Sequence, residues 1–274
     1  MTVRGIPWWR VSGLLAALLA MVGIGVSLGF SGRVYGGETA VLADAAIAQD
    51  LAGIAVALGI LVLDRLPGTG ARSLWLGALG FFAYNYAIYA FSLHFGPLFL
   101  VWVAVLGLSS FAALGGLVHV LGPDLPKPPE AARATGWYLM GAAVIFALLW
   151  LSEIVPDLIA GRPSTSAAAW LVPTSPVHVL DLAFFLPATF VAGVAVLRRR
   201  PYGALLAVPA LTWLALTCLP IFATPLVAVG RGHSASFAVY GSIGAVFVAS
   251  LVFLGIEVRR SLRTATVRAL GVTA

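Results

Sequence analysis

The chain has 274 residues, of which 61% are hydrophobic and only 9% are charged, and its mean hydropathy is +1.03. Soluble domains carry about 25% charged residues, so a water-facing globule of this size has no room to bury so many apolar side chains. The composition therefore excludes an ordinary soluble domain and predicts an all-α integral membrane protein. The net charge of +6 does not indicate a nucleic-acid partner, because the basic residues fall in short loops without interleaved aromatic residues.

Eight apolar segments approach the roughly 20 residues that a helix needs to cross the hydrocarbon core of a bilayer. In chain order they are 11–30, 45–63, 74–93, 98–121, 136–155, 178–197, 203–229 and 237–258. The first is interpreted as an uncleaved helix, because its apolar stretch is longer than that of a secretory signal and no clear cleavage site follows it. We expect residues 1–274 to form a single transmembrane domain.

The distribution of Lys and Arg over the loops predicts that both termini are cytoplasmic. With eight spans, thirteen basic residues fall on the side of the termini and three fall on the other side, and cytoplasmic loops are the ones enriched in Lys and Arg. The larger set is Arg4, Arg10, Arg65, Arg72, Lys127, Arg133, Arg198, Arg199, Arg200, Arg259, Arg260, Arg263 and Arg268. The smaller set is Arg33, Arg162 and Arg231.

The two halves of the chain share a pattern. The tripeptide "DLA" begins at Asp50 in the second predicted helix and again at Asp181 in the sixth, within the same order of long and short loops. Four helices per half would give both halves the same orientation, related by an axis along the membrane normal. We therefore expect a parallel 4+4 internal repeat with halves 1–127 and 128–274. The alternative is chance, because Leu and Ala are common throughout the chain.

Several polar side chains are out of place in apolar helices, where a charged Asp at the centre costs about 2.5–3.5 kcal/mol on insertion scales. The direction of each predicted helix places them together in the outer half of the bundle. The candidate ligand-binding residues are Asp50, Asn85, Tyr89, Glu153, His178 and Asp181. They predict an outward-facing acidic and polar pocket that binds a small ligand, a cation or protons, in transport or sensing.

Other interpretations remain open for these residues. The aspartates can cap helix starts, and Asn85 with Tyr89 can form hydrogen bonds between helices. The His178 and Asp181 pair, spaced i and i+3, could also belong to a metal site or orient a histidine base, which would suit a membrane-embedded enzyme at the outer leaflet. A third alternative is a structural subunit of a membrane complex. No catalytic residue, metal or cofactor is assigned, and Cys218 is interpreted as a small buried hydrophobe.

The stretches "YNYAIYAFSLHFGPLFL" and "SPVHVLDLAFFLPA" resemble a group of uncharacterised prokaryotic multi-pass membrane proteins. The resemblance implies the cytoplasmic membrane of a bacterium or archaeon, and it implies no activity and no residue roles. The expected partners are membrane lipids and a small ligand or cation from the outer side, without nucleic acid. The oligomeric state does not follow from the sequence.

Overall fold

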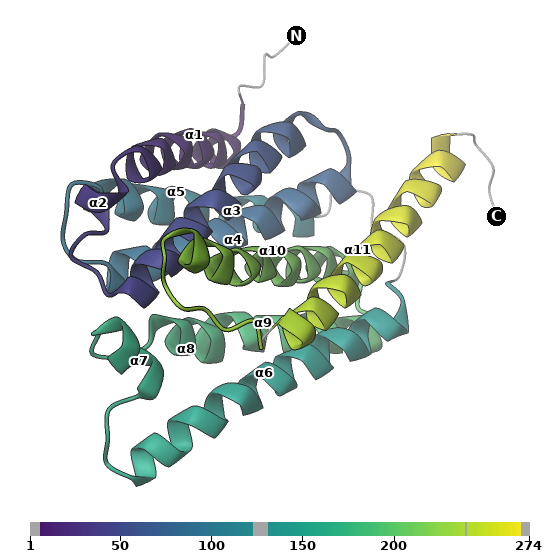
Figure 1. Cartoon of the computed structure of the whole chain (residues 1–274). Coiled ribbons are helices and arrows are strands. Elements are labelled where there is room, and N and C mark those ends of the chain that lie inside the picture. Colours follow the sequence, from purple (N-terminus) through teal and green to yellow (C-terminus); the bar gives the residue numbers. More distant parts are fainter. Residues whose placement is uncertain (1–5, 123–130, 239, 270–274) are drawn as a thin grey trace.

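The structure, a computed structural model, describes residues 6–122, 131–238 and 240–269, with side chains described up to residue 261. Within this part the chain is helical and contains no strand (Figure 1). The elements are α1 (Trp8–Gly29), α2 (Ser31–Val34), α3 (Ala40–Arg65), α4 (Thr69–Ser92), α5 (Phe99–Leu121), α6 (Arg133–Ile159), α7 (Thr165–Trp170), α8 (Pro176–Leu180), the π-helix η1 (Asp181–Phe185), α9 (Leu186–Leu197), α10 (Gly203–Gly230) and α11 (Tyr240–Ala269).

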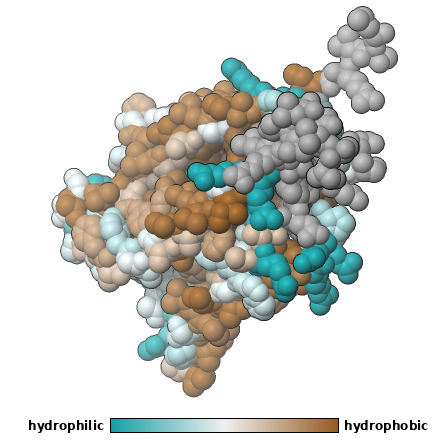
Figure 2. Space-filling view, turned by 90° about the vertical axis from the view of Figure 1, so that its right-hand side faces the viewer, coloured by the Kyte–Doolittle hydropathy of each residue, from teal (hydrophilic) through white to brown (hydrophobic). Residues whose placement is uncertain are grey.

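Eight of the described helices are long and apolar enough to cross a membrane, which confirms the predicted polytopic architecture. The sixth span, Pro176–Leu197, is continuous through α8, η1 and α9, and α11 counts as a span over Tyr240–Ser261. The surface of the bundle carries broad apolar areas, as expected where helices face lipid (Figure 2). The predicted boundary between the repeat halves, together with Arg4 and Lys127, lies outside the described residues.

One end of the bundle is closed by ion pairs and aromatic rings. The carboxylate of Asp64, at the end of α3, accepts hydrogen bonds from Arg10 (2.9 and 2.8 Å) and lies 3.3 Å from Nη1 of Arg72. The Arg72 guanidinium in turn lies 4.9 Å from the ring centroid of Trp9 and 5.1 Å from that of Trp75. We call this the arginine end.

The opposite, loop-rich end carries residues 30–39, 93–98, 160–175 and 231–238. There Asp44, near the start of α3, is 2.7 Å from Arg231 and 2.7 Å from His233, which follow α10. Two of the helices that begin at this end have side-chain caps, Thr39 for α3 and Ser175 for α8, whereas α5 begins without one.

The central helix is α10, which packs against α3, α4, α9 and α11. In the first half, α1 packs on both α3 and α5, and α4 packs on both α3 and α5, so these four helices close into a bundle. In the second half α6 packs on α9, closely enough that a Cβ added at Gly136 would lie 3.0 Å from the carbonyl oxygen of Gly193. The rest of α6 leans away from the bundle (Figure 1). In the most apolar 18-residue stretch of α6 only 17% of the residues are buried, against 72% in the same kind of stretch of α4.

The close contact between α4 and α10 can be tested with one methyl group. A Cβ at Gly77 would lie 2.5 Å from Cβ of Thr212 and 2.7 Å from the carbonyl oxygen of Pro209, whereas a Cβ at Gly80 meets nothing within 4 Å. We expect Gly77→Ala to lower the free energy of unfolding by about 1–3 kcal/mol and Gly80→Ala to leave it nearly unchanged. Thermal unfolding in nanodiscs measures both variants, and equal midpoints would contradict this packing.

Candidate functional site

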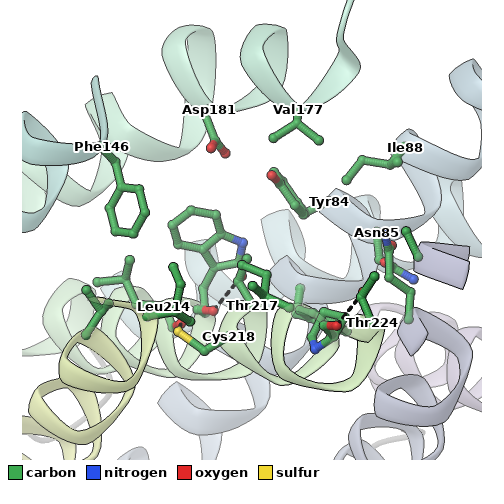
Figure 3. Close-up of a pocket in the computed structure, with 18 of the residues that line it drawn as sticks. Tyr84, Asn85, Ile88, Phe146, Val177, Asp181, Leu214, Thr217, Cys218 and Thr224 are labelled. Atoms are coloured by element: carbon green, nitrogen blue, oxygen red, sulfur yellow. Dashed lines mark hydrogen bonds between the residues drawn. The ribbon is translucent and has the colours of Figure 1, made fainter. Parts of the chain in front are cut away.

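A cavity of about 530 Å³ lies in the loop-rich half of the bundle, lined by residues of α3, α4, α6, α10 and α11 and of the run from α7 through α8 and η1 to the start of α9. Its volume lies in the range of about 300–1,000 Å³ that small-molecule sites occupy. Most of its wall is apolar, and Figure 3 shows part of that wall with Tyr84, Asp181 and Cys218 labelled. The wall also extends to Ser236, in the loop after α10, which places one side of the cavity at the loop-rich end.

Asp181 reaches this cavity through a local departure from α-helical geometry. Residues Asp181–Phe185 form a π-helix, in which the N–H of Leu186 donates to the carbonyl oxygen of Asp181 five residues earlier. The cause is Pro187, which has no N–H to donate to the carbonyl of Ala183 and whose ring crowds that carbonyl. Single-turn π-segments of this kind often occur at functional sites.

The Asp181 carboxyl group is only half satisfied. One oxygen, Oδ2, accepts a hydrogen bond of 2.8 Å from Nε1 of Trp150 on α6. The other, Oδ1, is buried and has no hydrogen-bond partner, although the residue as a whole is only 5% exposed. Tyr84 on α4 points its hydroxyl toward this carboxyl (Figure 3), and the two groups interact electrostatically without forming a hydrogen bond of normal length. A buried acceptor without a donor costs about 1–3 kcal/mol, so Oδ1 marks a position where a donor is missing.

Glu153 and His178 lie behind Trp150 and do not line the cavity. The imidazole ring of His178 lies 4.8 Å from the ring of Trp150, centroid to centroid, and its Nε2 is 4.0 Å from Oε2 of Glu153. Glu153 accepts hydrogen bonds of 2.8 Å from both the backbone N–H and the hydroxyl of Ser166. The Glu153 carboxylate therefore holds the start of α7 in place. The ring of His178 packs against the indole of Trp150, which donates a hydrogen bond to Asp181.

Asp50 and Tyr89 belong to a separate cluster that also lies outside the cavity wall. The Asp50 carboxyl group accepts hydrogen bonds from Ser27 of α1 (2.5 Å) and Tyr35 after α2 (2.6 Å), and it lies 3.0 Å from the hydroxyl of Tyr89 on α4, which shares its hydrogen with the carbonyl oxygen of Ala46 (2.6 Å). Burial, followed by the nearby charge of Asp50, raises the pKa of the Tyr35 hydroxyl well above its ordinary value, so this group stays a donor. The cluster ties three helices together, which is the interhelical alternative considered for Tyr89.

The structure therefore divides the six candidate residues among three places. Asn85 and Asp181 line the cavity, Asp50 and Tyr89 hold helices together, and Glu153 and His178 support Trp150. The metal ligands suggested by the sequence are not brought together either, because the described residues contain no group of three or more His, Cys, Asp or Glu side chains arranged to bind a metal ion.

The other acids near the loop-rich end have ionic partners. Glu38 lies 2.9 Å from Nδ1 of His94, and Asp157 lies 2.6 Å from Nε of Arg162, while Asp44 has the two partners described above. Among the described acids, Asp181 is the one that keeps a buried oxygen without a hydrogen bond.

The sequence interpretation missed the aromatic residues of the cavity wall, among them Tyr84, Trp150 and Trp213. A signal for Trp150 was present, since it lies three residues before Glu153 on one helix face and an indole N–H needs an acceptor when buried. No comparable signal separates Tyr84 from the other tyrosines of "YNYAIY", because only the packing of α4 decides which of them faces the cavity.

The Asp50 cluster predicts a difference between two matched substitutions. Tyr35→Phe removes one of the three donors to a buried carboxyl group, so we expect it to lower the free energy of unfolding by about 1–3 kcal/mol. Tyr84→Phe removes a hydroxyl that points toward the Asp181 carboxyl without forming a hydrogen bond of normal length, so its effect should stay below that of Tyr35→Phe. Chemical denaturation in mixed micelles measures both, and the reverse order would show that the Asp50 cluster does not stabilise the bundle.

Comparison with known proteins finds no relative of this chain. No protein-family model, no curated protein and no solved structure matches the chain. The resemblance to prokaryotic multi-pass membrane proteins therefore stays a prediction. What the chain is shown to be is a polytopic helical membrane protein with a cavity of small-molecule size in its loop-rich half.

Proposed function

We propose that this protein binds a small molecule with an apolar body and at least one hydrogen-bond donor, as the binding step of transport or sensing. The observation that carries the proposal is Oδ1 of Asp181, a buried acceptor without a donor on the wall of a 530 Å³ cavity. A ligand that donates to Oδ1 recovers the free energy of the missing hydrogen bond, and the apolar wall contributes about 25 cal/mol for each Å² of apolar surface that it buries.

In this conformation the structure supports binding of a ligand in the cavity, but not passage of the ligand through the arginine end. Asp64 with its two arginines and the rings of Trp9 and Trp75 close the arginine end between α1, α3 and α4, and a second cavity of about 220 Å³, which shares Trp213 with the first, lies between α4, α5, α9 and α10. A ligand in the cavity would therefore reach it from the loop-rich end or from the lipid phase. This arrangement suits a sensor, or a carrier that is closed toward the arginine end, and a flux assay in proteoliposomes separates the two.

The enzyme alternative has less support from the geometry. His178, the histidine suggested as a base, does not line the cavity. Two candidate nucleophiles on the wall are already engaged, since Thr217 donates to the carbonyl of Trp213 (2.8 Å) and Cys218 to that of Leu214 (3.2 Å). Within the described part of the chain no histidine lines the cavity, and neither residue forms a hydrogen bond with Asp181, so nucleophilic catalysis would lack its activating partner.

We also propose that the arginine end faces the cytoplasm of a prokaryotic cell, because short cytoplasmic loops are enriched in Lys and Arg. Green fluorescent protein fused after residue 274 should fluoresce, and alkaline phosphatase at the same position should be inactive. The two reporters should exchange behaviour when they are inserted after Gly161, in the loop between α6 and α7. An active phosphatase after residue 274 would reverse the proposed orientation.

The binding proposal can be tested by filling the cavity. Ala45 of α3 lines it, whereas Leu51 of the same helix is 45% exposed on the outside of the bundle. We expect native mass spectrometry from nanodiscs to show a bound small molecule on the wild type and on Leu51→Phe, and to show none on Ala45→Phe.

Cys218, the only cysteine of the chain, gives a second measurement of the same cavity. N-ethylmaleimide should modify its thiol at least fivefold more slowly in Ala45→Phe than in Leu51→Phe. Equal rates, together with no bound molecule in any of the three proteins, would contradict a ligand-binding cavity.

A further inference from the structure

The geometry points to a class of ligand: an organic cation, in which a protonated amine is carried on an apolar body. This inference rests on the proposed ligand-binding function and extends it, because it names the charge and the hydrogen-bonding character of the molecule that the cavity takes. Three independent properties of the wall support it, namely its charge, its hydrogen-bonding groups and its aromatic rings.

The charge of the wall favours a cation. Asp181 is the only acidic residue on it, and no Lys, Arg or His lines the cavity within the described part of the chain. The nearby bases Arg162, Arg231 and His233 are paired with carboxylates at the loop-rich end. An anionic ligand would therefore have no counter-charge in this apolar site, whereas an ammonium group would have the Asp181 carboxylate.

The wall carries donors, on the amides of Gln49 and Asn85 and on Trp213, together with acceptors that have no donor. The hydroxyls of Thr217 and Thr224 use their hydrogens on the carbonyl oxygens of Trp213 and Pro220, both at 2.8 Å, so their oxygens remain acceptors only. Gln49 contributes a second unpartnered oxygen, Oε1, beside the unpartnered Oδ1 of Asp181. An ammonium group has three donors and no acceptor, which matches the acceptors that have no donor.

The wall also presents aromatic rings on the side of α4 and α10. Tyr84 and Trp213 lie edge to face with centroids 5.6 Å apart, and Trp213 stacks on Phe185 at 4.8 Å. Across the cavity, Trp150 holds Asp181 by its N–H. Cations are attracted to ring faces within about 6 Å, so the ring faces of Tyr84, Trp150 or Trp213 that border the cavity would add to the attraction of the carboxylate. The unpartnered N–H of Trp213 is a neutral donor, which a lone pair on a polar substituent of the same ligand would satisfy.

The test compares three molecules that differ only in the head group: 4-phenylbutylamine, 4-phenylbutanol and 4-phenylbutanoate. Their binding to the full chain in nanodiscs is measured by isothermal titration calorimetry at pH 7, with empty nanodiscs as the correction for partition into lipid. We expect the wild type to bind the amine at least tenfold more tightly than the alcohol and to show no measurable affinity for the carboxylate.

Two substitutions of matched aspartates show where the preference arises. Asp181→Asn keeps the shape of the side chain and removes its charge, so the amine and the alcohol should then bind within about threefold of each other. Asp50→Asn is the control, because Asp50 lies in the hydrogen-bonded cluster outside the cavity wall, and it should keep the tenfold preference. Asp181→Glu keeps the negative charge, so it should keep a preference for the amine. This variant shows whether the lost preference in Asp181→Asn comes from the lost charge or from a loss of folding.

The outcomes distinguish this inference from the function on which it rests. Equal binding of amine and alcohol to the wild type would overturn the cationic class while leaving a ligand-binding cavity in place. Tight binding of the carboxylate would overturn it as well. If none of the three molecules binds above empty nanodiscs, the cationic class fails, and the native mass spectrometry of the Ala45→Phe series decides the binding function separately.

Discussion

A carboxylate buried among apolar helices needs hydrogen-bond donors, and the way in which this bundle supplies them determines much of its structure. Asp50 draws donors from α1, the segment after α2, and α4, and Asp64 draws two arginines from neighbouring helix ends. Because water is absent from the hydrocarbon core, a carboxylate at that depth can be satisfied only by groups of the protein itself. These acids therefore fix the positions of helices relative to one another, and Asp181 stands out because one of its oxygens remains unpaired.

The sequence predicts the helices well and their mutual contacts poorly. Eight spans follow from length and hydropathy alone, because each depends only on local composition. Asp50 and Asp181 share a tripeptide and a place in the helix order, yet one enters a closed cluster and the other a cavity. That difference depends on side chains from distant segments, Tyr35 in one case and Trp150 in the other, and helical periodicity does not show which helices become neighbours.

The two halves of the chain differ in how closely their first and last long helices pack against each other. In the first half, α1 and α5 pack together and complete a four-helix bundle. In the second half the helices in the same positions, α6 and α11, meet through Tyr138, whose hydroxyl lies 2.9 Å from the carbonyl oxygen of Val246 and whose ring stacks on Phe253, and only 17% of the most apolar stretch of each helix is buried. The cavity lies where the first and last helices of the second half do not pack closely together. The predicted duplication would then have one half that forms a closed four-helix bundle and one half that leaves room for a ligand.

The π-helix at Asp181–Phe185 also separates the side chain of the sixth span that faces the cavity from the residues that pack against α6. Each residue of an α-helix turns the chain by about 100°, so the one additional residue in this turn offsets the side chains before it from those after it by roughly that angle. Before the offset, the span presents Asp181 to the cavity, and after it, the span presents Gly193 to the backbone of α6 at Gly136. In a regular helix these two directions would be fixed to each other. The extra residue lets the packing face and the binding face be set independently along a single span.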